Sequence, residues 1–292
     1  MHPSIQSLLG DSPVVTDGAW GTQFQSLGLL PGDCPDGWCL TRPEAVESVA
    51  RAYVEAGSRI ILTNTFGANR FTLARHNLSD QAALINQRGV EISRQAAAGR
   101  ARVFASMGPS GKMLAMEEVT AEELTEAFTE QARAFAKAGA DGVVIETMTD
   151  LEETKVAVTA VRETGLPVVA CMVFDSGKEK DRTLMGVTPE QAAEELIATG
   201  ADVIGANCGH GIEGYISICR RLQAATDLPI WIKPNAGLPN LVNGQPVYQT
   251  TPAEFVRHLP ALAQAGATFI GGCCGTTPNH IRAVITQIRE HR

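Results

Sequence analysis

The chain has 292 residues, of which 44% are hydrophobic and 19% charged, a composition typical of a globular protein with a large core. Its formal net charge of −8 disfavours general binding to nucleic acids or other polyanions. The first residues lack a basic segment followed by an apolar stretch, and no apolar run is long enough to span a bilayer. We therefore expect a soluble, cytoplasmic protein that binds neither nucleic acid nor membrane.

Eight short apolar runs alternate along the chain with longer amphipathic segments. Each run contains a β-prone stretch that leads into Gly, Asn, Asp or Thr, as expected of a strand buried on both faces. Helical segments such as 41–58, 120–140 and 188–201 open with Thr followed by Pro or acidic residues and close at Gly, which are capping signals. The eight runs occupy residues 13–22, 59–68, 102–111, 142–150, 167–175, 201–209, 229–237 and 268–276.

Eight β-then-α units without an antiparallel hairpin signal predict a (β/α)8 TIM barrel that occupies residues 1–292 as a single domain. The alternative is a doubly wound open sheet. It is disfavoured because no G-x-G-x-x-G follows the first strand.

In such a barrel the active site lies at the C-terminal ends of the strands. Three of the seven cysteines fall at these ends, and they are Cys208 after the sixth strand and the adjacent pair Cys273 and Cys274 after the eighth. Only the seventh strand separates the two ends, so they lie about two strand spacings of ~4.8 Å each apart. Other polar residues at predicted strand ends are Asp17, Asn64, Glu146, Asp175, Asn207 and Asn235.

Adjacent residues of a regular strand point to opposite faces, so Cys273 and Cys274 can serve one centre only where the backbone turns. Glycines on both sides of the pair permit such a turn. Together with Cys208 the pair predicts a three-cysteine metal site with an open fourth position, and thiolate ligands favour zinc. The alternatives are core packing or a vicinal disulfide for the pair, and core packing for Cys208.

Three thiolates leave a zinc site of net charge about −1, a weak Lewis acid that is poorly suited to hydrolysis. Such a site suits an incoming thiol, because a free thiol of pKa ~8.5 is mostly protonated at neutral pH and a metal-bound thiol is deprotonated. The predicted chemistry is alkyl transfer to sulfur.

The segments "DGAWGT", "ILTNTFGANR", "SMGPSG", "ETMTD", "NCG", "PNAG" and "GGCCGT" resemble, in order and over essentially the whole chain, the zinc-dependent homocysteine S-methyltransferase family. The match looks closest to the homocysteine-binding domain of cobalamin-dependent methionine synthase. This resemblance implies a (β/α)8 barrel, homocysteine as the methyl acceptor, and methionine as the product.

The same resemblance implies roles for individual residues. Cys208, Cys273 and Cys274 would be the zinc ligands, and Glu146 would bind the α-amino group of the substrate. Asp17 and the backbone amides of Gly18 and Ala19 would lie at the substrate end of the first strand. The side-chain oxygen of Asn235 would occupy the fourth zinc position before substrate arrives. Asn64 and Asn207 are further substrate-side candidates, with ordering of loop backbone as the alternative.

Two departures from the family pattern stand out. The loop "NCGHGIEG" places His210 two residues from a ligand, and its role stays open; a solvated loop histidine is the default. The pair Lys233-Pro234 replaces an acidic residue often found before "PNAG".

The chain ends soon after the barrel, so we expect the methyl group to come from elsewhere. The favoured donor is a methylcorrinoid such as methylcobalamin, carried by a partner protein or by methionine-synthase-like modules. The alternative is a small onium donor such as S-methylmethionine or betaine, although the low aromatic content gives little support for an aromatic box around a cation. The sequence leaves open the donor, the oligomeric state, and the choice among homocysteine, selenohomocysteine and another small thiol.

Two rival classes remain. A zinc hydrolase would use His and carboxylate ligands, where this rim offers cysteines. A zinc-stapled structural or sensor barrel would need a fourth protein ligand, and the candidates His210 and His280 have no ligand-like spacing. Cys171 and Cys219 lie in apolar patterns and are predicted to be core residues, while Cys34 and Cys39 lie in a loop over the site.

Overall fold

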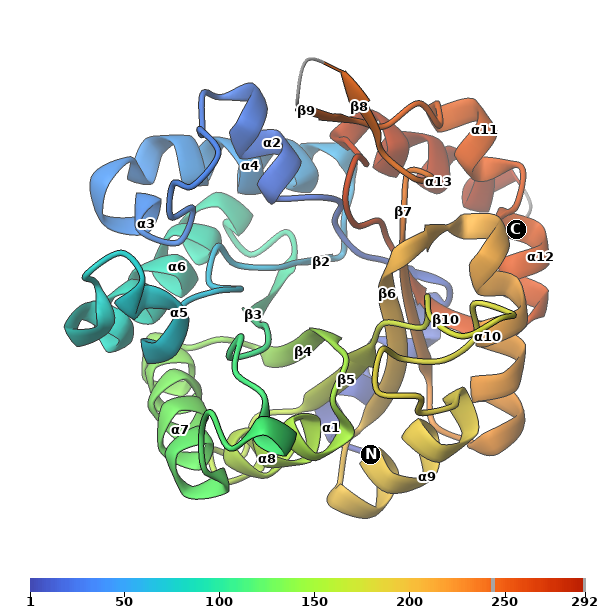
Figure 1. Cartoon of the computed structure of the whole chain (residues 1–292). Helices are drawn as coiled ribbons and strands as arrows, with labels where there is room; N and C mark the ends of the chain where they lie inside the picture. The colour runs from blue at the N-terminus through green and yellow to red at the C-terminus, as the bar shows by residue number, and fades with distance from the viewer. Residues whose placement is uncertain (243–244, 291–292) are drawn as a thin grey trace.

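A computed structural model describes residues 1–242 and 245–290 of the chain. Eight parallel strands form one sheet in the order β1-β10-β7-β6-β5-β4-β3-β2, and Figure 1 shows them curling into a barrel surrounded by helices. The backbone N–H of Arg59, just before β2, donates to the carbonyl of Val15 in β1 at 2.8 Å and joins the two ends of the sheet. The predicted (β/α)8 barrel is confirmed. The strands are β1 Val14–Val15, β2 Ile60–Ile61, β3 Arg102–Met107, β4 Gly142–Met148, β5 Val168–Met172, β6 Val203–Gly211, β7 Ile230–Asn235 and β10 Ala267–Ile270.

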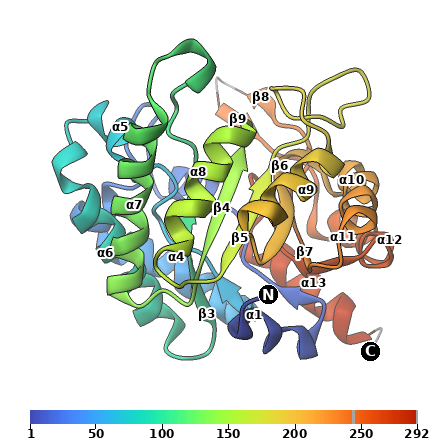
Figure 2. The same ribbon diagram turned by 90° about the horizontal axis from the view of Figure 1, so that it is seen from below.

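Each strand is followed by helical segments that cover the outside of the barrel, as Figure 2 shows from a second direction. The α-helices are α1 Pro3–Gln6, α2 Gly21–Ser26, α3 Trp38–Thr41, α4 Pro43–Ala56, α5 Arg70–Ala74, α6 Ala82–Ala97, α7 Ala121–Ala138, α8 Leu151–Arg162, α9 Pro189–Thr199, α10 Ile212–Ala225, α11 Pro252–Val256, α12 Leu259–Gln264 and α13 Pro278–Glu290. Short 3₁₀ helices lie at Leu9–Asp11, Ser79–Gln81 and Leu114–Met116.

The helix ends follow the capping signals in the sequence. Thr120 and Thr188 form capping boxes at the starts of α7 and α9, where the threonine hydroxyl accepts a backbone N–H of the first turn. Gly139 and Gly200 end these helices with φ of 80° and 104°, a left-handed conformation that glycine adopts at little cost. The sequence thus specifies where these two helices begin and end.

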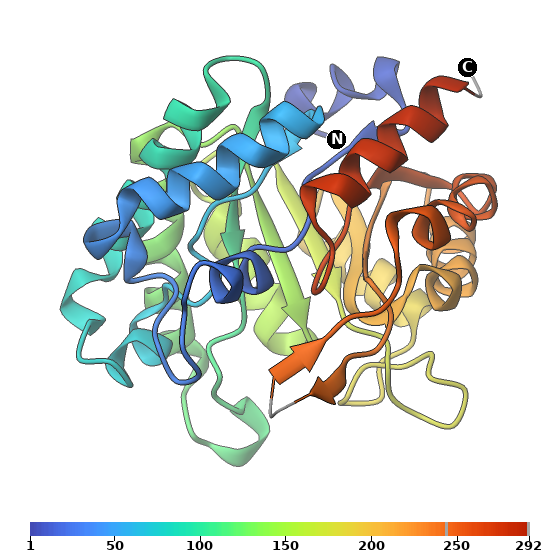
Figure 3. The same ribbon diagram turned by 90° about the horizontal axis from the view of Figure 1, so that it is seen from above.

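No antiparallel hairpin signal was recognised in the sequence, and this interpretation is wrong. Strands β8 (Asn240–Val242) and β9 (Gln245–Val247) pair in antiparallel fashion after β7. The sequence signal was an Asn-Gly pair between the two strands, a dipeptide typical of tight hairpin turns. Figure 3 shows this hairpin at the same end of the barrel as the loops that follow β1, β3 and β5.

The core has two layers. Apolar side chains from the strands fill the barrel interior, with Trp231 stacked on Phe104 at a centroid distance of 6.3 Å, and a larger cluster packs between strands and helices. The N-terminal helix α1 contributes Ile5 to the interior cluster, a contact that the sequence analysis did not predict. Cys171 in the interior and Cys219 in the outer layer are fully buried, as predicted.

None of the helices in the described part of the chain combines the length and the apolar character that crossing a bilayer demands.

Candidate functional site

The three cysteines predicted to share a centre come together at the C-terminal ends of β6 and β10. The Sγ atoms of Cys208, Cys273 and Cys274 all lie within 4.8 Å of one another. Strand β7 joins the two ends, because the N–H of Cys273 donates to the carbonyl of Pro234 at 2.7 Å and the N–H of Ala236 donates to the carbonyl of Cys274 at 2.9 Å. All seven cysteines are free, so the vicinal disulfide is not formed. Among the described residues, these three cysteines form a group that could hold a metal ion.

The local backbone turns the thiols toward one another. Cys208 has φ of 64° and Gly209 φ of 56°, and the register of β6 against β7 shifts immediately after Cys208. A left-handed conformation is uncommon for a residue with a side chain and indicates that the surrounding structure holds it. Gly275, directly after the cysteine pair, has φ of 80°, and a Cβ built there would lie 2.1 Å from the ring of Tyr248. The glycine therefore serves both the turn and the close approach of Tyr248.

Hydrogen bonds among the three thiols shift their pKa values in opposite directions. Those with Cys273 and Cys274 lower the pKa of Cys208 to about 3, whereas the bonds with Cys208 raise the pKa of Cys273 and of Cys274. The hydroxyl of Tyr248 also hydrogen-bonds Cys274. The cluster accordingly stabilises negative charge on sulfur within a mostly buried site.

Two asparagines flank the sulfurs. Asn207 accepts the N–H of Thr147 at 2.7 Å, and its amide nitrogen lies 3.4 Å from Glu146 and 3.9 Å from the Sγ of Cys273. Asn235 donates to the carbonyl of Gly209 at 2.9 Å, and its Oδ1 is buried without a hydrogen-bond partner among the described residues. A buried amide oxygen without a partner is costly, and it marks a place where a ligand would be accommodated.

A cavity of about 320 Å³ opens beside the sulfurs. Glu146, at the end of β4, lines this cavity and is 8% exposed. Its Oε1 accepts a hydrogen bond of 2.6 Å from Ser106. Burial raises the pKa of Glu146, with the charge of Lys233 opposing the shift. Gly18, Ala19, Trp20, Phe24, Asp36, Leu62, Asn64, Phe66, Lys233 and all three cysteines also line the cavity.

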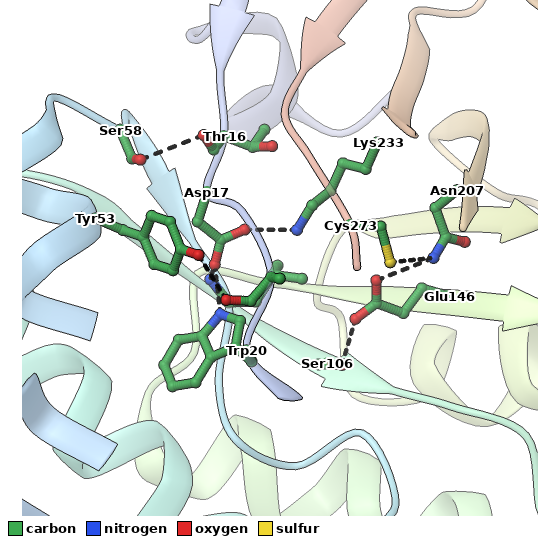
Figure 4. A network of polar contacts seen from close by, with 12 residues as sticks. Thr16, Asp17, Trp20, Tyr53, Ser58, Ser106, Glu146, Asn207, Lys233 and Cys273 are labelled. Carbon is green, nitrogen blue, oxygen red and sulfur yellow. Dashed lines mark hydrogen bonds and ion pairs between the residues drawn. The ribbon is translucent and has the colours of Figure 1, made fainter. Parts of the chain in front are cut away.

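Asp17 reaches this region as the partner of a buried lysine. Its Oδ1 lies 2.5 Å from the Nζ of Lys233, and its Oδ2 accepts the indole N–H of Trp20 and the backbone N–H of Leu62, both at 2.7 Å (Figure 4). Asp17 and Lys233 are 0% and 2% exposed. Burial alone lowers the pKa of Lys233, but Asp17 and Glu146 outweigh it, so the pKa is raised and the lysine stays charged.

Other predicted residues are held by neighbouring backbone. The amide N–H of Ala19 donates to the hydroxyl of Thr276 at 3.1 Å, and Gly18 lines the cavity next to it. Asn64 also lines the cavity, and its side chain donates to the carbonyl of Pro35 at 2.7 Å, which ties the loop after β1 to β2. Cys39 donates to the carbonyl of Asn64 at 3.2 Å.

The two histidines considered as ligands lie outside the sulfur cluster. His210 is half-buried in β6, with its Nε2 unpaired among the described residues. His280 is engaged on both ring nitrogens, by Thr277 and by the carbonyl of Thr250 at 2.9 Å. Within residues 1–242 and 245–290, no histidine therefore joins the three cysteines as a fourth ligand.

Three residues that the fold brings to this site had no predicted role: Lys233, Tyr248 and Asp36. The signal for Lys233 was a charge inside the apolar run "PIWIKPNAG". Tyr248 lies beyond the hairpin and gave no signal. Asp36 lies in the loop after β1, accepts the N–H of Gly67 at 2.9 Å, and has its pKa raised to about 6 by burial.

Comparison with known proteins places this site in a family. The sequence model described as homocysteine S-methyltransferase matches residues 14–288. The chain is 32% identical to methionine synthase from Mycobacterium leprae and 33% identical to methionine synthase from Mycobacterium tuberculosis. These matches cover 96% and 97% of this chain but 24% and 25% of the relatives, so the chain spans about a quarter of their length.

Solved structures show the same fold. The metallated and oxidized forms of the homocysteine methyltransferase MmuM from Escherichia coli superpose with TM-scores of 0.81 and 0.83 at 23% and 22% identity. The matches cover 97% and 98% of this chain and 99% and 100% of MmuM. At this identity the likeness establishes the barrel, and the family rests on the sequence match over residues 14–288. The chain belongs to the homocysteine S-methyltransferase family.

Proposed function

We propose that this barrel is a zinc-dependent S-methyltransferase that methylates homocysteine to methionine. The observation that carries the proposal is the convergence of three sulfurs within 4.8 Å at the edge of a cavity that also contains Glu146. Sulfur ligands and a carboxylate in one cavity suit a substrate with a thiol at one end and an ammonium group at the other.

The residues present fit a zinc ion. A tetrahedral zinc with bonds of ~2.3 Å to sulfur holds its ligands ~3.8 Å apart, a spacing compatible with three Sγ atoms within 4.8 Å. The unpaired Oδ1 of Asn235 supports the prediction that this oxygen takes the fourth position before substrate. Both ring nitrogens of His280 are engaged elsewhere, which disfavours a closed structural site.

When bound, zinc would supply a fourth coordination position at which a thiol is kept deprotonated. Cys208, Cys273 and Cys274 would hold the ion. The carboxylate of Glu146, fixed by Ser106, would accept the α-ammonium group and so orient the thiol end toward the sulfurs. The apolar part of the cavity wall would pack on the methylene groups and exclude water.

For the methyl donor we propose a methylcorrinoid carried by a partner protein or by methionine-synthase-like modules. Large apolar side chains are exposed in the segments that follow the C-terminal ends of β1, β3, β5 and β7, a pattern that suits contact with a protein surface. They are Leu30 (65% exposed), Met116 (66%), Leu184 (68%), Leu238 (67%) and Leu241 (79%). The chain is similar to about a quarter of the length of two proteins named methionine synthase, and this similarity supports a methylcorrinoid donor.

A small onium donor such as S-methylmethionine or betaine is the second candidate. Trp20 and Phe66 line the cavity, and aromatic faces attract onium cations. The test compares the rate of methionine formation from homocysteine with each donor. A faster rate with S-methylmethionine than with methylcobalamin would favour this candidate over the corrinoid.

Zinc-edge X-ray absorption, recorded with and without homocysteine, tests the acceptor. We expect three sulfurs and one light atom to become four sulfurs when homocysteine is added. Cys273→Ala should bind less than one equivalent of zinc, whereas Cys219→Ala, which removes a buried thiol outside the cluster, should retain it. If the zinc spectrum did not change when homocysteine was added, homocysteine would not be the acceptor. If the wild-type protein bound no zinc, the proposed mechanism would be refuted.

A further inference from the structure

A second and larger cavity lies at the opposite end of the barrel from the sulfur cluster. Its volume is about 580 Å³, which is within the range of small-molecule sites in proteins. Arg59 lies directly before β2, Arg102 begins β3, and Asp141 lies directly before β4. The cavity is therefore formed at the N-terminal ends of these strands, whereas the three cysteines lie at C-terminal ends.

The wall of this cavity is rich in arginine. Four arginines line it, and Asp141 is the one acidic residue among the described residues of the wall. Four positive charges and one negative charge give the wall a formal charge of +3, in a chain whose formal net charge is −8. Like charges around one cavity repel one another, and an anion between them would replace the repulsion by attraction. The arginines are Arg59, Arg94, Arg100 and Arg102.

Two of the arginines are held by contacts with neighbouring segments. Arg94, near the end of α6, donates to the carbonyl of Gly139 after α7 at 2.5 Å. Arg102 forms an ion pair of 3.2 Å with Asp141, whose second oxygen accepts the N–H of Val103 at 2.8 Å. A guanidinium group has five N–H donors, so each contact fixes the side chain and leaves further donors for a ligand.

Arg100 lies between these two arginines and has no such structural contact. The chain leaves α6 through Ala98 and Gly99, whose φ values of 46° and 75° form a left-handed turn before β3. Within the described residues, no hydrogen bond or ion pair is recorded for the side chain of Arg100, which is exposed. An unpaired guanidinium presents parallel N–H groups that fit two oxygens of a phosphate group. Arg100 is thus available to bind a phosphate in this cavity.

We propose that this cavity binds a ligand that carries a diphosphate group. Two linked phosphoryl groups carry about three negative charges at neutral pH, which matches the charge of the wall, whereas a single carboxylate would leave most of it unbalanced. The ligand is either free pyrophosphate or a nucleoside diphosphate, and Leu8 and Val103 in the wall offer apolar contact to a nucleoside. This site goes beyond methyl transfer and does not depend on the proposed function.

The first test measures binding to the wild-type chain by calorimetry at physiological ionic strength. The probes are pyrophosphate, ADP, adenosine and sulfate. We expect pyrophosphate to bind at least about tenfold more tightly than sulfate, as an additional charge-assisted contact implies, and adenosine not to bind. ADP that binds more tightly than pyrophosphate would identify a nucleotide site, and weaker binding of ADP would identify a pyrophosphate site. Absence of binding, or equal affinities for pyrophosphate and sulfate, would overturn the inference.

The second test locates the bound anion with variants of the wall. Arg100→Gln should weaken the binding of pyrophosphate at least about tenfold, whereas Arg133→Gln, which removes an exposed arginine of α7 outside the cavity, should keep the wild-type affinity. Asp141→Asn should tighten binding severalfold, because it removes a negative charge and leaves an oxygen for the N–H of Val103. Wild-type affinity in Arg100→Gln, or weaker binding by Asp141→Asn, would overturn the inference.

Discussion

Replacement of Asp36 by Asn should make the protein more stable at neutral pH and leave its stability in acid unchanged. Asp36 is 3% exposed, and burial raises the pKa of its carboxyl group from 3.8 to about 6. Between these values the folded protein retains a proton that the unfolded chain has released. Stability therefore falls as the pH rises from about 4 to about 6, and the full cost is present above that interval.

The magnitude follows from the size of the shift. Two pH units at 1.36 kcal/mol each give a penalty of about 3 kcal/mol for the charged carboxylate at pH 7.5. The amide introduced by the substitution would carry no charge, and its oxygen could still accept the N–H of Gly67, so the variant avoids the penalty without losing that hydrogen bond. We expect Asp36→Asn to gain up to about 3 kcal/mol at pH 7.5 and about zero at pH 4.

Urea denaturation at both pH values, with a chelator present so that metal release does not contribute, measures the difference. Asp33→Asn is the matched control, because it removes an exposed carboxylate from the same loop and should change the stability little at either pH. A difference between Asp36→Asn and wild type that stays constant from pH 4 to pH 7.5, or a less stable variant at pH 7.5, would refute the reasoning.

Three further predictions concern the buried ion pair, the turn after the cysteine pair and the cap of one helix. Lys233→Met should lower the free energy of unfolding, measured with urea, by about 3–5 kcal/mol because it leaves the buried carboxylate of Asp17 without a partner. Adding Asp17→Asn should restore most of this stability. A double variant no more stable than Lys233→Met would show that the two side chains are not coupled. Gly275→Ala should lower the thermal midpoint, since the new methyl group meets the ring of Tyr248, and a second change, Tyr248→Ala, should restore part of it; a neutral Gly275→Ala would show that the loop relaxes freely. Thr120→Ala should cost about 1 kcal/mol and speed amide exchange in the first turn of α7, whereas unchanged exchange would argue against the capping box.

Local signals in the sequence carried the prediction of the barrel and of the sulfur cluster. A strand buried on both faces needs an apolar run, and Cys208 and Cys274 follow such runs, so their convergence could be predicted from strand order alone. The ion pair between Lys233 and Asp17 could not be predicted in this way, because it joins strand ends whose residues are 216 positions apart in the sequence. The elevated pKa of Asp36 likewise depends on how one loop is buried, which no local pattern encodes.

The closing of the barrel also determines when the site can exist during synthesis. Strand β1 pairs with β10 through Val14 and Val15 against Phe269 and Ile270, so this edge of the first strand finds its partner only when nearly the whole chain has been made. A nascent chain that has not yet reached Cys273 offers one of the three sulfurs. The proposed metal site is therefore complete only after translation has passed the last strand.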